Sequence, residues 1–358
     1  MSVNTPAPQW VILGGTGFVG SSVMAELRAR SLPAFSLQAP RLTTAAQTAN
    51  AIAAIAVGAA DATGAIAVGA KVADAADAGA VAGANAAADV IAAFVQLKDA
   101  FAGAAVVVNA AGLATPGERA SGAMMGANAL LPGLAALAAR AAGVPVFIHL
   151  SSASVQGHRP IIDETADRAP FSAYSRSKAI GEEVLETVRA QNPSPAGDAG
   201  RITTVRATSV QGPSRPTTQQ LVRIARSRIS SVAAPGTAPT PVSSINALSW
   251  FVTEVALYEG PIPAIVLQPW EGLGVAQVLT AAGGRSPLQL PAWLAHTVLA
   301  CGYAVSKVAR EKLHGPLRRV ELMWFGQSQR PGWAQEAGVL PHSAVREVLQ
   351  AAQSVSGS

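Results

Sequence analysis

The stretch Gly14-Gly15-Thr16-Gly17-Phe18-Val19-Gly20 decides the fold of this chain. It follows a short apolar run at residues 10–13 and precedes residues 21–30, whose apolar side chains recur at helical spacing. Residues 34–37 have the pattern of a second strand, so the segment predicts a βαβ unit. Glycines permit a tight turn and the close approach of a pyrophosphate, and the next helix offers N–H groups to negative charge. We therefore expect a dinucleotide site whose cofactor-binding residues include Gly14, Thr16, Gly17, Phe18, Val19 and Gly20.

Length and composition narrow the classes of function. The chain has 358 residues, of which only 13% are charged, and its net charge is +5. One nucleotide-binding domain and a smaller region fit this length. The cations are spread thinly apart from Arg310, Lys312, Arg318 and Arg319, so we expect no nucleic-acid partner. Cys301 is the only cysteine, which excludes an internal disulfide, and no Cys/His cluster has zinc spacing, so we expect no metal.

Targeting signals are not visible in the sequence. The N-terminal residues have no basic segment followed by an apolar one, so we read no signal peptide. No uncharged apolar run reaches the ~20 residues of a membrane span, and the nearest approach is residues 288–305. We expect a cytoplasmic protein without an integral membrane segment.

Short apolar strands alternate with helices over the first 212 residues. The strands are expected at residues 105–109, 146–150 and 202–206, and the helices at 88–101, 126–142 and 172–189. This alternation predicts an α/β fold: a doubly wound parallel sheet of the Rossmann type, covered on both faces.

The domain boundaries follow from changes in composition. Residues 1–212 are the expected dinucleotide-binding domain, interrupted at residues 43–93 by an irregular insertion rich in Ala and Gly. Within that insertion, residues 44–56 are a candidate helix and 65–72 a candidate third strand. Residues 213–352 are the expected substrate cap, small and mostly helical, with a return strand near 264–267, and residues 353–358 are an expected disordered tail.

Two further segments are expected to contact a cofactor. An acid at the end of the second strand would hold the adenosine ribose of NAD, but Gln38 stands there and Arg41 lies just beyond, so the pattern leans slightly towards NADP over NAD. The strand that ends in Asn109-Ala110-Ala111-Gly112 supplies small residues where a cofactor must pass closely.

Tyr174 and Lys178 are the expected catalytic pair. Four residues apart on one helix, they share a face, and an ammonium beside the phenol favours the phenolate. Tyr174 can then exchange a proton with a substrate oxygen, while Lys178 also bonds the nicotinamide ribose. Asn128 lies on a helix that faces this region, where it either supports a water or backbone group or is a surface residue.

These motifs in this order resemble the short-chain dehydrogenase/reductase superfamily, and within it the extended NAD-dependent epimerase/dehydratase family. SSASVQG at residues 151–157 resembles that family's serine-bearing strand end, and VRATSVQGP at residues 205–213 resembles its segment after the sixth strand. The resemblance implies that Ser152, Tyr174 and Lys178 are the catalytic triad. It also implies a homodimer through the helices of Asn128 and Tyr174.

Departures from the family pattern limit the substrate. Ala153 and Ser154 stand where dehydratases carry an Asp-Glu pair, which argues against elimination of water. Gln156 and Gln211 replace the family's tyrosines. Ser209 stands where many nucleotide-sugar enzymes carry an Asn; we expect Ser154 and Ser209 on the substrate side of the site. The nearby cations either bind phosphates or form a solvated helix face: Arg215, Arg223, Arg226 and Arg228.

Three functions remain open at this point. The first is an NAD(P)-dependent oxidoreductase or epimerase acting on a nucleotide-sugar-like substrate. The second is a reductase or dehydrogenase of an apolar alcohol or ketone, which Ser209 and the apolar residues 291–305 motivate. The third is a non-catalytic protein that binds the cofactor.

The C-terminal part is expected to cover the substrate. Residues 291–313 are apolar and then basic, and the segment is either a cap helix or a helix at a membrane surface or dimer contact. We expect its large apolar side chains to pack as one face: Trp293, Leu294, Val298 and Val305. Three aromatic residues are expected to close the apolar side of the cap: Trp324, Phe325 and Trp333.

Overall fold

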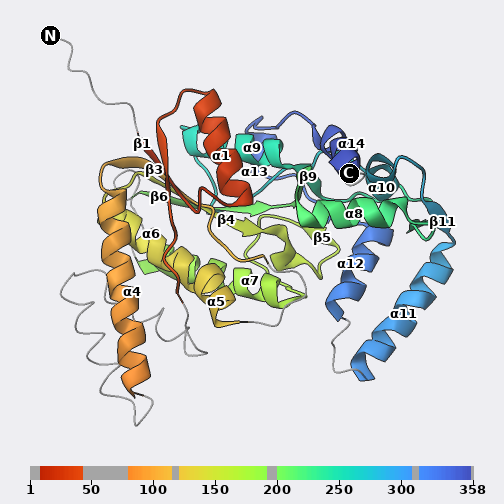
Figure 1. The fold of residues 1–358 in the computed structure, drawn as a ribbon, viewed down its shortest axis with the longest axis horizontal. Helices are drawn as coiled ribbons and strands as arrows, with labels where there is room; N and C mark the ends of the chain where they lie inside the picture. Colours follow the sequence, from red (N-terminus) through yellow and green to blue (C-terminus); the bar gives the residue numbers. More distant parts are fainter. Residues whose placement is uncertain (1–8, 43–79, 115–120, 192–199, 309–313, 356–358) are drawn as a thin grey trace. The chain divides into compact units, whose positions relative to one another are not determined.

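A computed structural model describes residues 9–42, 80–114, 121–191, 200–308 and 314–355. Its main feature is a six-stranded parallel sheet with the strand order β10-β6-β4-β3-β1-β2, flanked by helices (Figure 1). The expected doubly wound α/β fold is therefore confirmed. The candidate helix at 44–56 and the candidate strand at 65–72 lie outside the described residues.

The N-terminal βαβ unit forms as the sequence predicts. Strand β1, Gln9–Leu13, pairs in parallel with β2, Ala34–Leu37. Helix α1, Phe18–Ala29, lies between them and buries Val23 and Leu27, which are one helical turn apart. The helix begins three residues earlier than expected because the glycine turn leads into it directly.

Helix α4, Ala80–Phe101, corrects the expected irregular insertion. The sequence predicts a helix only from residue 88, because residues 80–87 carry few large side chains, but residues 80–87 are helical as well. Alanine has the highest helix propensity of all residues, so a shortage of large side chains does not prevent a helix. Residues 43–79 lie outside the described part of the chain.

The helix expected at 126–142 contains a change of pitch. It begins as α5, Gly122–Met125, capped by the Ser121 side chain, passes through a π-helical turn at Gly126–Leu130, and continues as α6, Leu131–Ala141. Pro132 has no N–H to donate to the carbonyl of Asn128, so the regular hydrogen-bond ladder is interrupted at this turn. The helix ends before Gly143, whose φ of 71° is that of a left-handed cap, as the sequence predicts.

The strands that carry the site continue the sheet. Strand β3, Ala104–Asn109, pairs in parallel with both β1 and β4, Val146–Ser152. Strand β6 is Arg201–Ala207, and the expected return strand is confirmed as β10, Ile265–Leu267. Helix α7, Ala173–Gln191, connects β4 and β6 across the sheet.

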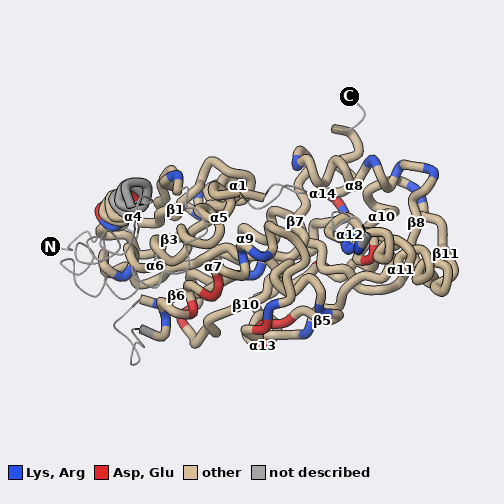
Figure 2. The backbone as a smooth tube through the Cα atoms, turned by 90° about the horizontal axis from the view of Figure 1, so that it is seen from below, with Lys and Arg blue, Asp and Glu red and all other residues tan. Residues whose placement is uncertain are grey.

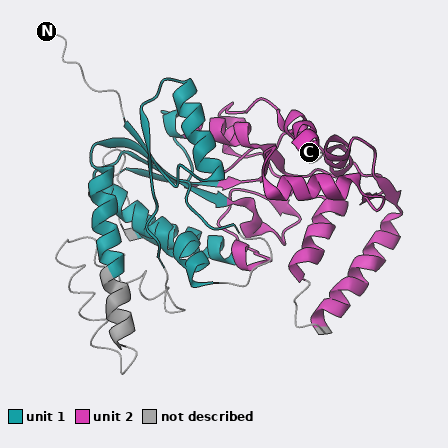
Figure 3. Cartoon of the chain, in the orientation of Figure 1, with its two compact units in different colours: residues 1–151, 176–205, 256–264 teal, residues 152–175, 206–255, 265–358 magenta. Residues whose placement is uncertain are grey.

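The chain forms two compact units (Figure 3). Unit 1 comprises residues 1–151, 176–205 and 256–264, and unit 2 comprises 152–175, 206–255 and 265–358. The units are not sequential segments: residues 152–175 of unit 2 precede the predicted boundary at 212, and unit 1 includes residues 256–264 from beyond it.

Unit 2 is mostly helical, with short two-stranded sheets β11-β8, β12-β5 and β7-β9. Its core gathers apolar side chains such as Val222, Leu279 and Leu349. The remaining elements, most of them wholly in this unit, are η2 Ala153–Gln156, β5 Ile161–Ile162, β7 Ser209–Gln211, α8 Pro216–Arg226, β8 Ser231–Ala233, β9 Val242–Ser244, α9 Ile245–Leu257, α10 Val275–Gly283, β11 Leu288–Leu290, α11 Ala292–Val308, α12 His314–Phe325, β12 Ser328–Gln329, α13 Trp333–Glu336 and α14 Val345–Val355.

The expected packing of α11 is wrong for its largest side chains. Trp293, Val298 and Val305 are exposed. The helix instead buries Ala295, Leu299 and Ser306, and small residues on the inner face let it approach α12 closely. Of the three aromatics expected to close the cap, Trp333 is buried with its ring 6.3 Å from that of Phe251, whereas Trp324 and Phe325 are half-buried.

One helical stretch in the described residues, Gly122–Ala141, is long and apolar enough to cross a membrane, but 78% of it is buried. This stretch, and not residues 288–305, is therefore the most span-like part of the described chain. Its burial makes it a core helix of unit 1. Figure 2 shows Lys, Arg, Asp and Glu scattered along the rest of the chain.

Removing a large buried side chain from the core of unit 1 should destabilise the protein. Phe147 on β4 is 1% exposed, so Phe147→Ala should lower the free energy of unfolding by about 3–5 kcal/mol. Val95→Ala removes an apolar side chain that is 49% exposed and should change it by less than about 0.5 kcal/mol. Chemical denaturation of both variants measures the difference, and equal losses would contradict the assigned core.

Candidate active site

The glycine turn has a geometry that only glycine supports. Gly14 has a φ of 81°, in the left-handed region, and its N–H donates to the carbonyl of Leu37 at the end of β2, 2.8 Å away. A Cβ on Gly20 would lie 2.2 Å from the carbonyl oxygen of Gly14. The turn and the first turn of α1 are therefore pressed together, and larger residues at these two positions would separate them.

Gly17 is different, because the space beside it is open. A Cβ there would meet only the Gly14 carbonyl oxygen, at 3.3 Å. Gly17 is the N-cap of α1, and no acidic residue occupies the first turn of that helix. Thr16 and Gly17 are exposed, and Phe18 and Val19 are half-buried. Helical N–H groups behind an open glycine fit a bound pyrophosphate.

The residues expected to read the ribose lie beside this turn. Gln38 and Arg41 are both exposed; Gln38 directly follows β2, and Arg41 lies a few residues beyond it. Because Leu37 accepts the hydrogen bond of Gly14, the end of β2 is fixed next to the glycine turn. No acid stands at this strand end in the described sequence between residues 34 and 42.

The turn at residues 109–112 packs against the glycine turn. Ala110 donates to the carbonyl of Leu13, and a Cβ on Gly14 would lie 2.8 Å from the Cα of Ala111. Asn109 is fully buried, and its Oδ1 accepts the N–H of Ala111 at 3.2 Å. The two segments that the sequence predicts to bind the cofactor, the glycine turn and residues 109–112, are therefore in contact.

A buried histidine on the neighbouring strand β4 contacts the side chain of Asn109. The Asn109 amide nitrogen lies 3.3 Å from Nδ1 of His149. Burial, together with the charges of Lys178 and Arg189, holds the pKa of His149 well below its usual value. The ring is therefore neutral, and Nδ1 accepts from the amide, which assigns the ring proton to Nε2.

Asn128 is a buried anchor and not a surface residue. Its Oδ1 accepts the N–H of Leu113 at 2.9 Å, and its Nδ2 donates to the Leu113 carbonyl at 2.8 Å and to Ser177 Oγ at 3.0 Å. The π-helical turn carries this side chain inwards. A Cβ on Gly112 would lie 2.9 Å from Asn128 Oδ1 and 3.1 Å from Lys178 Nζ, so residues 112, 128 and 178 meet at one point of unit 1.

Lys178 is a desolvated ammonium. It is 4% exposed, and its Nζ donates to the Leu150 carbonyl at 2.8 Å. Burial lowers the pKa of Lys178 to about 8, and the charge of Glu182 opposes that fall. Glu182 is itself buried and accepts the Ser151 hydroxyl at 2.6 Å. A carboxylate four residues further along α7 thus stabilises the charged form of the lysine.

In unit 2, Ser152 and Tyr174 form a hydroxyl pair. The side chain of Ser152 is hydrogen-bonded to Tyr174 and to Ser154 Oγ at 2.8 Å. Burial raises the pKa of Tyr174, and the Ser152 hydrogen bond and the charge of Arg215 only partly oppose this. The expected lowering of the tyrosine pKa by Lys178 is therefore corrected: the shift is upward, and Arg215 is the cation that counters it.

Arg215 differs from the other arginines of its segment. It is half-buried at the N-cap of α8 and donates to the Val210 carbonyl. By contrast, Arg223, Arg226 and Arg228 are exposed. Sequence reasoning grouped all four together, and only Arg215 contributes to the electrostatics of Tyr174.

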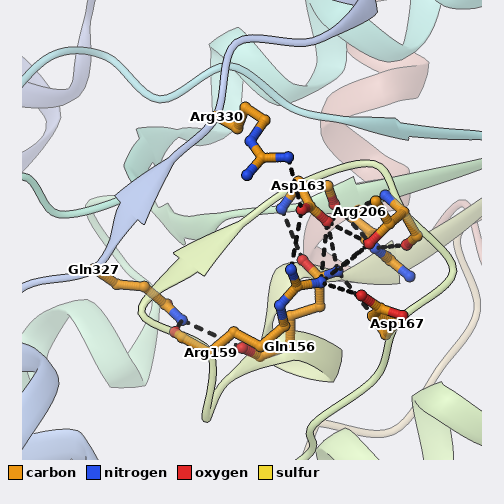
Figure 4. A network of polar contacts seen from close by, with 8 residues as sticks. Gln156, Arg159, Asp163, Asp167, Arg206, Gln327 and Arg330 are labelled. Atoms are coloured by element: carbon orange, nitrogen blue, oxygen red, sulfur yellow. Dashed lines mark hydrogen bonds and ion pairs between the residues drawn. The ribbon is translucent and has the colours of Figure 1, made fainter.

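The two glutamines that replace the family tyrosines have structural partners. Gln156 donates to Asp163 Oδ1 at 2.9 Å and accepts the N–H of Asp163 at 2.8 Å. Arg206 donates to the carbonyls of Asp163 and Thr165 (Figure 4). Gln211 accepts the Thr218 hydroxyl at 2.9 Å and donates to the carbonyl and hydroxyl oxygens of the exposed Ser209.

The network in Figure 4 fixes the segment that follows Ser152. Arg159 pairs with Asp163 at 3.2 Å, and Gln327 donates to the Arg159 carbonyl at 2.6 Å. Burial raises the pKa of Asp163, but hydrogen bonds from Thr165 and Gln156 outweigh it, so the net shift is downward. A charged, hydrogen-bonded carboxylate therefore anchors residues 156–167 within unit 2.

Two supporting residues escaped sequence reasoning. Glu182 carried a signal, because it lies four residues after Lys178 and so on the same helical face as Tyr174 and Lys178. His149 carried none, because a single histidine in an apolar strand does not reveal its partner across the sheet.

Residues 10–244, more than half of the chain, match the model of the NAD dependent epimerase/dehydratase family. The chain belongs to this family. Its members are NAD(P)-dependent enzymes, and the chain is an oxidoreductase or epimerase of this kind, with NAD or NADP as cofactor. A search of curated proteins finds no match.

Several solved structures share the fold of the chain at low sequence identity. MoeE5 in complex with UDP-glucuronic acid and NAD has a TM-score of 0.56 at 16% identity, over 98% of this chain and 100% of that one. UDP-glucuronic acid 4-epimerase from Bacillus cereus with NAD has a TM-score of 0.58 at 15% identity, over 97% and 96%. Human epimerase family protein SDR39U1 with NADPH has a TM-score of 0.55 at 16% identity, over 98% and 99%.

The open space beside Gly17 predicts that a substitution there weakens cofactor binding without lowering the stability of the protein. In Gly17→Ala, the methyl group meets only one atom of the protein but fills room that a pyrophosphate would need. We expect NAD(P) binding to weaken at least about tenfold, with the melting temperature of the cofactor-free protein nearly unchanged. Calorimetric titration and thermal unfolding measure the two effects.

The matched control is Gly143→Ala. Its φ of 71° disfavours alanine, and nothing lies near a Cβ there, so it should lower stability by about 1 kcal/mol and leave cofactor binding intact. Undiminished binding in Gly17→Ala would contradict the assigned pyrophosphate position.

Proposed function

We propose that this chain catalyses reversible hydride transfer at a carbinol or carbonyl carbon of a nucleotide-sugar-like substrate, with Tyr174 as the acid/base. The observation that carries the proposal is the hydrogen-bonded hydroxyl pair of Ser152 and Tyr174 within reach of the Arg215 charge. Two neighbouring hydroxyls, one at the end of β4 and one at the start of α7, suit a single substrate oxygen, which one polarises and the other protonates.

The roles follow from the groups that are present. A bound nicotinamide would supply or accept the hydride, held by the glycine turn and by the turn at residues 109–112. Ser152 Oγ donates a hydrogen bond to the substrate oxygen and orients it. Tyr174 Oη delivers its proton to that oxygen during reduction and takes it back during oxidation.

The ionisation of Tyr174 supports a proton donor in the resting enzyme. Because the pKa of Tyr174 is raised, the phenol is protonated at neutral pH and is ready for the reductive direction. Oxidation requires the phenolate, so a positive charge must be close at that moment. Arg215 beside Tyr174 is the cation proposed to stabilise it, whereas Lys178 is proposed to bond the nicotinamide ribose.

The choice between epimerase and dehydrogenase rests on the fate of the ketone. If it stays bound and is reduced from the other face, the sugar is epimerised; if it leaves, the cofactor is consumed. Ala153 and Ser154 supply no acid–base pair next to Ser152. Elimination of water needs such a pair, so we do not propose a dehydratase.

A nucleotide sugar is the proposed substrate class. MoeE5 binds UDP-glucuronic acid and UDP-glucose in the solved complexes, and the chain shares its fold. The apolar alternative rested on residues 291–305 and on Ser209. Trp293, Val298 and Val305 are exposed, so they do not form an enclosed apolar pocket within unit 2, which weakens that alternative.

For the cofactor we propose NADP in preference to NAD. Gln38 and Arg41 are exposed beside the end of β2, and the absence of an acid there in residues 34–42 removes the usual partner of a free 2′-hydroxyl. Arg41 offers a charge for a 2′-phosphate.

The first test removes the proposed acid. Tyr174→Phe should reduce kcat by about 10²–10⁴-fold, because it deletes the proton donor and keeps the ring. Turnover of UDP-glucose and UDP-glucuronic acid is followed by NMR of the sugar and by nicotinamide absorbance. Tyr303→Phe is the control, since that hydroxyl bonds Glu321 on α12 and its loss should leave kcat unchanged.

Full activity of Tyr174→Phe would overturn the proposed role. Turnover of neither sugar, with reduction of an apolar ketone instead, would replace the proposed substrate class and keep the chemistry.

The second test addresses the charge of Lys178. The rate of reduction should fall as pH rises through about 8, where Lys178 loses its proton. Glu182 raises that pKa, so Glu182→Gln should move the fall to lower pH while Gln still accepts the Ser151 hydrogen bond. pH profiles of kcat measure the shift.

Glu183→Gln is the matched control, because Glu183 is the exposed neighbour and its loss should not move the profile. A profile of Glu182→Gln identical to wild type would separate Glu182 from the function of Lys178.

A further inference from the structure

Asn109 and His149 form a buried polar pair across two strands of the sheet. Strands β3 and β4 run in parallel with Asn109 directly opposite His149, and β1 places Leu13 opposite Asn109 on the other side. Both polar side chains are fully buried. Leu13 immediately precedes the glycine turn, so one row across three strands leads from the histidine to the start of that turn.

The amide group of Asn109 contacts a different partner with each of its two ends. Its Oδ1 accepts the N–H of Ala111 at 3.2 Å, and its Nδ2 lies 3.3 Å from Nδ1 of His149. Because a backbone N–H can only donate, Ala111 requires the amide oxygen, and the amide nitrogen must then face the ring. An acceptor on His149 therefore secures the amide in the one orientation that bonds the backbone of Ala111.

The orientation of this amide matters because the backbone of Ala111 is pressed against the glycine turn. A Cβ on Gly14 would lie 2.8 Å from the Cα of Ala111 and 2.9 Å from its nitrogen. The nitrogen that Asn109 bonds is thus at the closest approach of the two turns. A reversed amide would set two donors against each other, Nδ2 of Asn109 and the N–H of Ala111, and would displace the turn at residues 109–112.

His149 carries a cost that packing in the strand does not require. Its Nε2 is buried and has no hydrogen-bond partner among the described residues. Phe147, two residues earlier and so on the same face of the sheet, is a buried apolar residue. An apolar side chain at position 149 would likewise avoid burying an unpaired N–H. The histidine is therefore explained by its other ring nitrogen, Nδ1, and not by packing.

We propose that His149 is a positioning residue for the dinucleotide cofactor. With its proton on Nε2, the ring presents Nδ1 as an acceptor to Asn109, and Asn109 in turn holds the turn at residues 109–112 against the glycine turn. His149 thus acts on the cofactor site through Asn109, from the neighbouring strand. The inference rests on the proposed binding of the cofactor at these two turns.

Two substitutions separate the acceptor from the volume of the ring. His149→Leu fills similar space but offers no acceptor, so the dissociation constant of the tighter-binding of NAD and NADP should rise about tenfold. His149→Asn is smaller, but its Oδ1 is as many bonds from the backbone as Nδ1 of histidine and can accept from Asn109. Its dissociation constant should stay within about threefold of wild type. Calorimetric titration of the full chain measures both.

Thermal unfolding should rank the same two variants in the opposite order. His149→Asn leaves a cavity and should lower the melting temperature more than His149→Leu, although it binds the cofactor more tightly. A general loss of packing would weaken binding in step with stability and cannot produce this reversal. Thr203→Val is the matched control. It removes a buried hydroxyl on β6 that has no partner in the described part of the chain, and it should leave cofactor binding unchanged.

The ring proton gives a readout that a change in stability does not move. Nitrogen-15 NMR of the wild-type protein should show His149 with Nε2 protonated and Nδ1 unprotonated, and the spectrum of His149→Asn identifies its signals by their loss. Because the tautomer is read in the wild-type protein, this test does not depend on the folding of His149→Leu.

Three outcomes would overturn the proposal: unchanged cofactor binding by His149→Leu, binding by His149→Asn as weak as that of His149→Leu, or a proton on Nδ1 in the wild-type protein. Gly17→Ala shows where a failure lies. If Gly17→Ala weakens binding and His149→Leu does not, only the role of His149 fails. Unchanged binding in both variants would refute the proposed cofactor position itself.

Discussion

A buried ammonium is the constraint on which the rest of unit 1 depends. Lys178 loses its water, and only the Leu150 carbonyl, the charge of Glu182 and the surrounding polar groups stabilise its charge. A Cβ on Gly112 would crowd both Asn128 Oδ1 and Lys178 Nζ, and Asn128 holds the neighbouring loop through both its amide atoms. The turn at 109–112, the π-helical turn and helix α7 thus meet around this charge, and the glycine turn packs on the other side of the turn at 109–112 through Ala111.

The sequence predicted the parts of the site that are local in the chain. A glycine turn between a strand and a helix, or two residues four apart on a helix, has a geometry fixed by neighbouring residues. The ionisation of Tyr174 could not be predicted in this way. Its sign depends on how deeply the phenol is buried and on Arg215, which lies 41 positions further along the chain, and neither is written in the Tyr-x-x-x-Lys spacing.

Side-chain size misled the prediction in two opposite directions. Residues 80–87 looked irregular because they are small, yet alanine favours helix whether or not it buries much area. Trp293, Val298 and Val305 looked like core because they are large, yet α11 packs through Ala295 and Gly302. Which face of a helix is buried depends on what lies against it, and a largely apolar helix such as α11 gives no periodic signal to choose between faces.

The π-helical turn has a consequence for how α6 and α7 pack. Pro132 leaves the Asn128 carbonyl without its usual donor, and Gly181 of α7 lies so close that a Cβ there would come within 2.2 Å of that oxygen. One turn further, Gly133 of α6 receives the side chain of Val184 in the same way, at 2.3 Å. The two helices therefore interlock through one glycine each and cannot slide past one another by a residue. Register along α7 sets where Lys178 meets Asn128, so the alignment of the lysine is fixed by two positions that carry no side chain.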